Sequence, residues 1–210
     1  GFTNVEIMVP FVRTVGEAEQ VVELLAENGL KRGENDLRLI MMCELPSNAI
    51  LAKQFLEYFD GFSIGSNDLM QFMYAADRGN PRVATRYDTL SPGFISSLRR
   101  ISEQCQQHHV EFSICGEMAS QPLEAMVLVA LGFRRLSMRP NAIGAVKEMI
   151  LSLDTNALRQ EMSRMGERNE GSLRPMFEAL YSPPPMSRCN QKMTLLLSEL
   201  GGYIAGFRYA

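Results

Sequence analysis

Three polar residues follow a short apolar run in the stretch Asp60-Gly-Phe-Ser-Ile-Gly-Ser-Asn-Asp-Leu-Met-Gln71. The apolar run breaks on Gly65, and Ser66, Asn67 and Asp68 come directly after it. In parallel α/β proteins, chemistry takes place at the carboxyl ends of strands, so polar groups at this point are candidates for a functional site. The alternative is that they cap a helix, since all three residue types are good N-caps.

Two carboxylates, Glu44 and Asp68, follow neighbouring strand-like runs. Such a pair suits a hard divalent cation such as Mg²⁺, which takes one or two protein carboxylates and completes its shell with water and substrate oxygens. The alternative is that each carboxylate caps the helix after its strand.

A thiol and a guanidinium complete the set of candidates. Cys115, in Ile-Cys-Gly-Glu, ends a strand-like run, where a thiol facing a pocket can be tuned for proton transfer. Arg78 offers a planar fork suited to phosphate. The alternatives are a buried cysteine and a solvated surface arginine. Together, these groups describe an anionic substrate, Mg²⁺ and a proton donor.

Five strand–helix units are predicted to position these residues. The pattern predicts strands at 5–9, 37–43, 62–64, 110–115 and 135–138. It predicts helices at 17–27, from 47 through 59, from Asp68 to 76, from 91 to 108, from 121 and at 141–153, with a loop at 77–82. This alternation predicts a parallel sheet with both faces covered, either open and doubly wound or part of an eight-unit barrel. No G-x-G-x-x-G follows a strand, which disfavours a dinucleotide fold.

Composition narrows the class of protein. The 210 residues carry a net charge of −3 with both signs interspersed, so no nucleic-acid surface is expected. The four cysteines show no CxxC spacing and indicate reduced thiols in a cytoplasmic protein. His108 and His109 are adjacent, which disfavours joint metal binding, and we expect them on the surface near a helix C-terminus. No signal peptide or membrane-spanning run is apparent, and the missing initiator Met suggests a fragment or processed chain.

The end of the chain differs from the rest. Helices are predicted at 156–168 and 172–181, followed by the stiff break Pro183-Pro-Pro185 and a short helix at 193–200. We therefore expect a core unit at 1–153, a helical extension at 154–181 and a tail at 182–210 in which no site is apparent.

Three motifs resemble the phosphoenolpyruvate-utilising enzymes, the family of phosphoenolpyruvate synthase, pyruvate phosphate dikinase and Enzyme I of the sugar phosphotransferase system. The longest is Phe62-Ser-Ile-Gly-Ser-Asn-Asp-Leu-Met-Gln71 followed by Ala76-Asp-Arg78. The others are Met41-Met-Cys-Glu-Leu-Pro-Ser-Asn48 and Ser113-Ile-Cys-Gly-Glu-Met-Ala119, in the family's order.

The resemblance changes along the chain. Residues 4–68 look like phosphoenolpyruvate synthase, whereas 69–153 look more like Enzyme I of the nitrogen-regulatory branch. We hypothesise a mosaic, natural or constructed, joined at the motif that both share; a parent gene continuous in either family across the junction would contradict it. Residues 182–210 resemble neither.

The resemblance implies a phosphoenolpyruvate-binding (β/α)₈ TIM barrel, of which this chain would supply the last five βα units. It implies Glu44 and Asp68 as Mg²⁺ ligands and Asn67 with Arg78 as phosphate-binding residues. Cys115 would protonate the enolate of the substrate to give pyruvate, or remove that proton in the reverse direction.

Two departures from the family are expected to matter. Further substrate-binding arginines and the phosphohistidine domain are absent from this chain, and Arg139 replaces a small residue that is usual at the last strand end. We expect a phosphoenolpyruvate–protein phosphotransferase of Enzyme I type that acts with a phosphohistidine domain or phosphocarrier protein. The alternatives are a synthase fragment and a non-catalytic interaction module. Open sheet edges predict a homo-oligomer.

Overall fold

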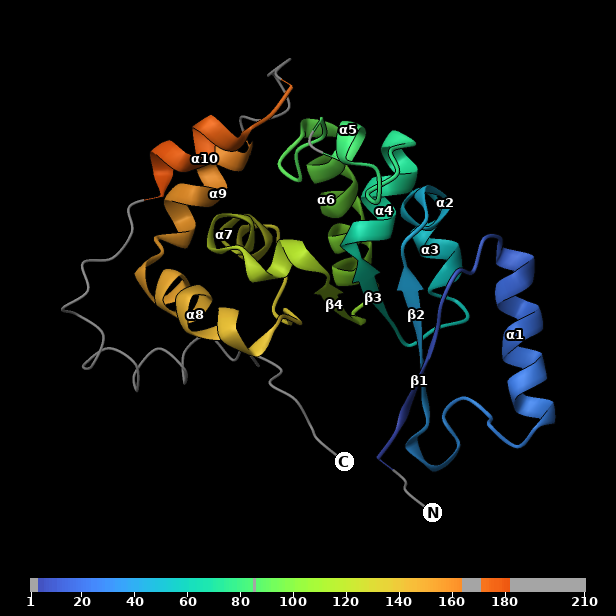
Figure 1. The fold of residues 1–210 in the computed structure, drawn as a ribbon. Helices are drawn as coiled ribbons and strands as arrows, with labels where there is room; N and C mark the ends of the chain where they lie inside the picture. The colour runs from blue at the N-terminus through green and yellow to red at the C-terminus, as the bar shows by residue number, and fades with distance from the viewer. Residues whose placement is uncertain (1–3, 85, 164–170, 182–210) are drawn as a thin grey trace.

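The computed structural model describes residues 4–84, 86–163 and 171–181 (Figure 1). Four parallel strands lie side by side in the order β1 (Glu6–Val9), β2 (Arg38–Cys43), β3 (Gly61–Gly65) and β4 (Glu111–Cys115). The principal helices are α1 (Val15–Glu27), α2 (Pro46–Ile50), α3 (Ala52–Phe55), α4 (Ser66–Tyr74), α5 (Pro81–Ala84), α6 (Pro92–Gln107), α7 (Pro122–Ala130), α8 (Ile143–Ser152), α9 (Thr155–Ser163) and α10 (Arg174–Leu180). Short 3-10 helices occupy Glu34–Asp36, Glu117–Ser120 and Pro140–Ala142. The predicted parallel α/β class is confirmed.

Several helix boundaries follow from local sequence signals. Thr14 caps α1 by accepting a hydrogen bond from the Glu17 N–H at 3.1 Å, and the helix ends before Asn28 and Gly29, as predicted. Pro92 and Pro122 each occupy the first turn of their helix, where a missing N–H leaves no bond unmade.

Three expectations about the elements are corrected. The long second helix breaks at Leu51, whose backbone leaves the helical region and separates α2 from α3. α4 begins at Ser66 rather than at Asp68. The predicted loop at 77–82 includes the start of the short helix α5.

The fifth predicted strand, 135–138, is reduced to a single parallel bridge between Ile114 and Leu136. Two hydrogen bonds hold it, from the Ile114 N–H to Arg135 and from the Ser137 N–H to Ile114. The ladder stops there because Pro140 has no N–H to donate and the chain enters a 3-10 helix. The segment still runs beside β4, so its end reaches the same edge of the sheet.

Alternate residues along a strand point to opposite faces, and the two faces of this sheet differ. One face is apolar and fully buried, through Leu39, Met41, Cys43, Phe62, Ile64 and Ile114. The register places polar groups on the other face, at Glu6, Arg38, Ser63, Glu111, Ser113 and Cys115. Met8 on this second face is 46% exposed. The expectation that both faces are covered therefore holds only in part among the described residues, since Ile40 and Ser63 on the second face are buried whereas Met8 is open to water.

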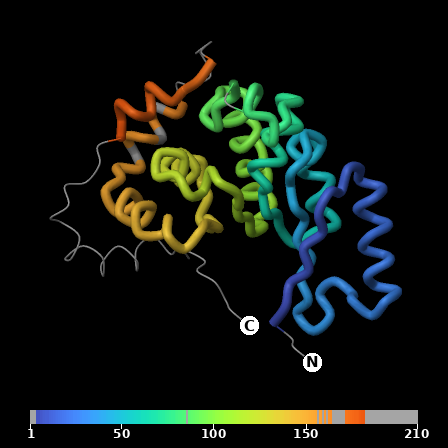
Figure 2. The backbone as a smooth tube through the Cα atoms, in the orientation of Figure 1, coloured from blue at the N-terminus to red at the C-terminus, as the bar shows by residue number. Residues whose placement is uncertain are grey.

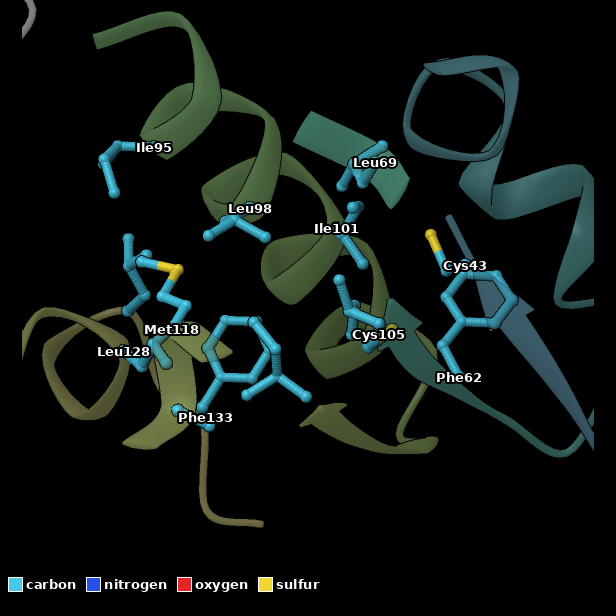
Figure 3. Close-up of a cluster of buried hydrophobic side chains, with 14 of the residues drawn as sticks. Cys43, Phe62, Leu69, Ile95, Leu98, Ile101, Cys105, Met118, Leu128 and Phe133 are labelled. Carbon is cyan, nitrogen blue, oxygen red and sulfur yellow. The ribbon is translucent and has the colours of Figure 1, made fainter. Parts of the chain in front are cut away.

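The apolar face packs against α6 and the segments beyond β4 (Figures 2 and 3). Labelled members of this core are Cys43, Phe62, Leu69, Ile95, Leu98, Ile101, Cys105, Met118, Leu128 and Phe133. Burial of this apolar surface is the main source of stability, at about 25 cal/mol per Å² removed from water. The sheet edge is therefore a rigid support for the groups that follow the strands.

Charged groups tie the opposite, amino ends of the strands together. Arg38 contacts Glu6 at 3.0 Å and Glu111 at 2.6 Å, and Arg135 donates to Glu111 at 2.7 Å. Gly61 pairs with Ile40 on β2 and with Glu111 on β4, so no β3 side chain stands beside Glu111 on the face that Arg38 crosses. A Cβ at Gly61 would lie 2.4 Å from the Glu111 carbonyl oxygen.

An ion-pair cluster joins α10 to the rest of the structure. Arg174 donates to both carboxylate oxygens of Asp88, at 2.9 and 2.7 Å, and to Glu124 at 2.6 Å. Ser172 also donates to Asp88, at 2.6 Å, and the Leu173 N–H bonds the Leu90 carbonyl. The helices α9 and α10 lie where two helices were predicted, although 164–168 fall outside the described residues.

None of the helices in the described ranges is both long and apolar enough to cross a membrane. The predicted helix at 193–200 also falls outside these ranges.

Candidate active site

The carboxyl ends of β2, β3 and β4 meet at one edge of the sheet. Cys43, Ile64 and Ile114 are in register across the three strands, and Gly65 pairs with Cys115. The structure therefore brings together Glu44, the Ser66–Asp68 stretch and Cys115, which were predicted to share a site.

Glu44 is buried at this edge, with 1% of its surface exposed. Its Oε1 accepts a hydrogen bond of 2.8 Å from the Phe11 N–H, in the segment after β1. Burial raises the pKa of Glu44 and the nearby Asp68 carboxylate raises it further, while the Phe11 N–H lowers it. Glu44 therefore bonds a neighbouring loop rather than the helix after its own strand, and the capping alternative is wrong for this residue.

Asn48 fixes the loop that carries Glu44. Its Oδ1 accepts from the Glu44 and Leu45 N–H groups, at 3.2 and 3.0 Å, and its Nδ2 donates to the Val12 carbonyl at 2.8 Å. Because this side chain is fully buried, it locks the loop after β2 to the loop after β1. The sequence motif includes Asn48, but no role was predicted for it.

Gly65 allows Glu44 to approach β3. A Cβ at this position would lie 3.0 Å from the Glu44 Cβ and 3.2 Å from its Oε2, closer than ordinary contacts. The glycine at the break between strand and helix therefore leaves room for the buried carboxylate.

Asp68 lies in the first turn of α4, where the helix dipole favours a negative charge. Its Oδ1 is 3.5 Å from a guanidinium nitrogen of Arg78, which is 57% exposed. The N-cap of α4 is Gly65, without a side-chain capping bond, so the alternative that this polar stretch caps the helix is wrong. The structure thus places two predicted site residues beside each other.

Ser66 and Asn67 bind the loop after β4. Ser66 donates to the Cys115 carbonyl at 2.7 Å, and the Glu117 N–H donates to the Asn67 Oδ1 at 3.3 Å. Gly116 has a φ of 103°, and a Cβ there would lie 2.3 Å from the Ser66 Oγ, so a larger residue would be both strained and crowded. The Asn67 oxygen is used in this contact, which leaves its amide N–H groups as donors toward a ligand.

Cys115 is half-buried, and its thiol donates to the Ile64 carbonyl at 3.4 Å. Burial raises its pKa, a hydrogen bond with Ser63 lowers it, and the Glu44 and Asp68 carboxylates raise it again. The thiol therefore keeps its proton at neutral pH, as an acid does, rather than forming a reactive thiolate. These mutual effects also place the thiol and both carboxylates in one electrostatic neighbourhood.

Two hollows open beside Asn67. The first, of about 410 Å³, is lined by Asn67, Gly116, Glu117, Ser120, Ser137, Met138, Arg139 and Pro140. The second, of about 110 Å³, is lined by Asn67, Met70, Gln71, Ala76, Arg78, Ala84 and Tyr87. Both lie beside loops at the carboxyl edge, where a ligand of a parallel sheet is expected.

The donor set fits a hard cation. Glu44 and Asp68 offer carboxylate oxygens, which Mg²⁺ prefers, and the raised pKa of Glu44 reflects in part a carboxylate repulsion that a cation would relieve. No group of three or more His, Cys, Asp or Glu side chains with metal-binding geometry occurs among the residues described. Two carboxylates suffice for Mg²⁺ when substrate and water supply the other oxygens. His108 and His109 are exposed at the end of α6, as predicted.

Comparison with known proteins identifies the family. The profile described as "PEP-utilising enzyme, PEP-binding domain" matches residues 1–155. The chain belongs to this family. The resemblance inferred from three motifs is confirmed, and the edge described above lies within the phosphoenolpyruvate-binding domain.

Curated relatives in this family are named phosphoenolpyruvate synthase. The proteins of Pseudomonas aeruginosa, Neisseria meningitidis and Escherichia coli K12 are 54%, 51% and 48% identical over 144 residues. Each alignment covers 68% of this chain and 18% of the relative, so the chain spans about a fifth of these proteins.

Similarity to the synthases does not stop at Asp68, where the resemblance was expected to change to Enzyme I. Each alignment is 144 residues long, so similarity to synthases continues well beyond residue 68. The Enzyme I interpretation of 69–153 is not confirmed, and the mosaic stays a prediction.

Proposed function

We propose that this chain is the phosphoenolpyruvate- and pyruvate-binding part of an enzyme of the phosphoenolpyruvate synthase type, with Mg²⁺ as cofactor. The names of the relatives support this alternative over the Enzyme I activity that the sequence favoured. Because the chain spans only a fifth of those relatives, the activity of the whole enzyme is a proposal for this protein.

One observation carries the proposal. Glu44, Asp68 and Cys115 lie at the same carboxyl edge of the parallel sheet, where Gly65 pairs with Cys115, faces Glu44 and is followed by the helix turn that carries Asp68. Helix capping or the burial of a structural cysteine would not require these three groups to lie together. Protonation of an anionic substrate held by Mg²⁺ would require them to lie together.

The residues divide the chemistry among them. Glu44 and Asp68 would hold Mg²⁺, which when bound would stabilise negative charge on the enolate and phosphoryl oxygens. Asn67 and Arg78 bind the phosphate, and Arg78 exchanges its contact with Asp68 for the ligand.

Cys115 handles the proton. As the phosphoryl group passes from the enol oxygen to the histidine of the proposed phosphohistidine domain, the thiol gives its proton to the methylene carbon, so that pyruvate forms and a thiolate remains. In the synthase direction, the thiolate takes a proton from the pyruvate methyl group, and the enolate oxygen accepts the phosphoryl group from the phosphohistidine, which returns to histidine. The raised pKa of Cys115 suits the first direction at neutral pH.

The finer architecture is also a proposal. The four strands and the bridged segment after them would be the last five units of a (β/α)₈ barrel formed by residues 1–153, with 154–181 as a helical extension. The partners would be a phosphohistidine domain and further copies of the chain, since a partial barrel leaves sheet edges that can pair. We expect the enzyme in the cytoplasm.

Isothermal titration calorimetry with phosphoenolpyruvate, in the presence and absence of Mg²⁺, tests the proposal. We expect Mg²⁺-dependent binding that Glu44→Gln or Asp68→Asn weakens by at least tenfold. Glu103→Gln, which removes an exposed carboxylate from α6, is the matched control and should bind as the unaltered chain does. A folded chain that binds no phosphoenolpyruvate with Mg²⁺ would contradict the proposal and favour a non-catalytic module.

A further inference from the structure

We propose that Arg139 binds the carboxylate of the substrate, opposite the phosphate held by Arg78, and that Glu117 weakens this binding by competing for the same guanidinium. The inference deepens the proposed function, on which it rests, by assigning a second anion-binding residue to the site.

The fold brings Arg139 to the edge of the sheet that carries Cys115. The Ser137 N–H donates to the Ile114 carbonyl at 2.9 Å, so the segment after Phe133 runs parallel to β4. Arg139 follows two residues later, where the chain turns into a 3-10 helix at Pro140. It is therefore placed at a strand end as Glu44 is, although the strand itself is only a bridge.

Arg139 lines the larger hollow. This space of about 410 Å³ also meets Asn67, Gly116 and Glu117, which belong to the loops after β3 and β4. The smaller hollow on Asn67 is lined by Arg78. Asn67 thus borders two spaces, each with one arginine, and Arg78 and Arg139 are the cationic side chains that line them.

The substrate needs two cationic contacts. Phosphoenolpyruvate carries a phosphate at one end and a carboxylate at the other, and each is bound well by a guanidinium fork. With Arg78 and Asn67 on the phosphate and Mg²⁺ on the enolate and phosphoryl oxygens, the substrate carboxylate is left for another cationic side chain. The other arginines that bond carboxylates of the sheet, Arg38 and Arg135, do so at its opposite end through Glu111.

The ion pair between Arg139 and Glu117 is weak enough for a substrate carboxylate to replace it. The Arg139 guanidinium lies 3.9 Å from the Glu117 Oε1, and the two side chains are 64% and 69% exposed. An ion pair this long and this exposed to water contributes little. A substrate carboxylate can therefore replace Glu117, although Glu117 still opposes an incoming anion through its charge.

The inference predicts opposite effects on ligand binding for substitutions of Arg139 and Glu117. Removal of Arg139 should weaken binding, whereas removal of the Glu117 charge should strengthen it. Because both effects act through one guanidinium, the gain from Glu117→Gln should depend on Arg139 being present. A general effect of net charge would not show this dependence.

Calorimetric titrations of phosphoenolpyruvate, pyruvate and inorganic phosphate with Mg²⁺ test the inference on the full chain. We expect Arg139→Gln to weaken phosphoenolpyruvate and pyruvate by about tenfold and to leave phosphate unchanged. Glu117→Gln should tighten the two carboxylate ligands by about threefold, but not in the Arg139→Gln background. Arg82→Gln removes the same charge from an exposed position on α5 and serves as the control.

Three results would overturn the inference. One is an equal effect of Arg139→Gln and Arg82→Gln. Another is a loss of phosphate binding without loss of pyruvate binding, which would place Arg139 on the wrong end of the substrate. The third is a Glu117→Gln gain that persists without Arg139. If the unaltered chain binds neither phosphoenolpyruvate nor pyruvate, the proposed function itself fails, and this inference fails with it.

Discussion

The contact between Asp88 and Arg174 predicts a defined dependence of stability on pH. Burial by itself would raise the pKa of Asp88, but hydrogen bonds from Arg174, Ser172 and the Leu90 N–H lower it to about 2, from an ordinary 3.8. At about 1.4 kcal/mol per pH unit, this difference stabilises the folded state by about 2 kcal/mol at neutral pH. The side chain of Asp88 is 21% exposed, so solvent screens the pair only modestly.

The sign follows from the direction of the shift. Because the folded pKa is lower than the unfolded one, the stabilisation is complete above about pH 4 and is lost as the pH falls toward about 2. Asp88→Asn should therefore be less stable than the unaltered chain by about 2 kcal/mol at pH 7 and by about 1 kcal/mol at pH 3.

Urea unfolding followed by far-UV circular dichroism, at several values between pH 7 and pH 3, measures this difference. Asp77→Asn is the control, since Asp77 is exposed and accepts a hydrogen bond from the Gly79 N–H. Equal stability of Asp88→Asn and the unaltered chain at pH 7 would refute the reasoning. A difference that stays constant down to pH 3 would also refute it, because packing rather than charge would then be responsible.

Three other predictions concern the site. Gly65→Ala should weaken Mg²⁺-dependent phosphoenolpyruvate binding by about tenfold, because its Cβ would lie 3.0 Å from the Glu44 Cβ; calorimetry measures this, and unchanged binding would show that the loop adjusts freely. Asn48→Ala should lower the free energy of unfolding by about 2 kcal/mol, since it leaves buried backbone groups without hydrogen-bond partners. A change below about 0.5 kcal/mol in urea titrations would show that Asn48 does not stabilise the contact between the loops after β1 and β2. Alkylation of Cys115 by iodoacetamide should rise with pH later than for a free thiol, because burial raises its pKa; a midpoint below that of free cysteine would contradict this.

The candidate site was predictable from sequence because its signal is local. Glu44, Asn67, Asp68 and Cys115 each follow an apolar run, and parallel strands bring such positions to one edge whatever the details of their helices. The order of four strands follows from the same alternation.

What sequence reasoning missed depends on contacts between distant segments. Asn48 bonds Val12 from 36 positions away, and the Ser66 hydroxyl bonds Cys115 from 49 positions away. The glycines at 65 and 116 gave a partial signal, since glycine at a strand end often marks a close approach of chain segments. Only the structure shows that Gly65 faces Glu44 and that Gly116 faces Ser66.

The expected fifth strand shows a limit of pattern reasoning. Residues 135–138 alternate as a strand does, but a ladder also needs a partner with free backbone groups and a continuation beyond each end. The segment cannot continue as a strand at Pro140, which has no N–H to donate, and its partner β4 ends where the chain turns at Gly116. Only one bridge between the two segments therefore forms. The partly exposed second face was missed for a similar reason, since the alternation of strands and helices does not show which side the helices cover.

The central claim is that phosphoenolpyruvate, Mg²⁺ and the Cys115 thiol meet at one site. Protection from alkylation tests it most directly, with the rate of modification of Cys115 followed by mass spectrometry in a Cys189→Ser background; Cys43 and Cys105 are buried. The account predicts that phosphoenolpyruvate with Mg²⁺ slows this modification at least fivefold, that phosphoenolpyruvate alone has little effect, and that Glu44→Gln abolishes the protection. Unchanged alkylation at concentrations where calorimetry shows phosphoenolpyruvate bound with Mg²⁺ would place the ligand elsewhere and contradict the account.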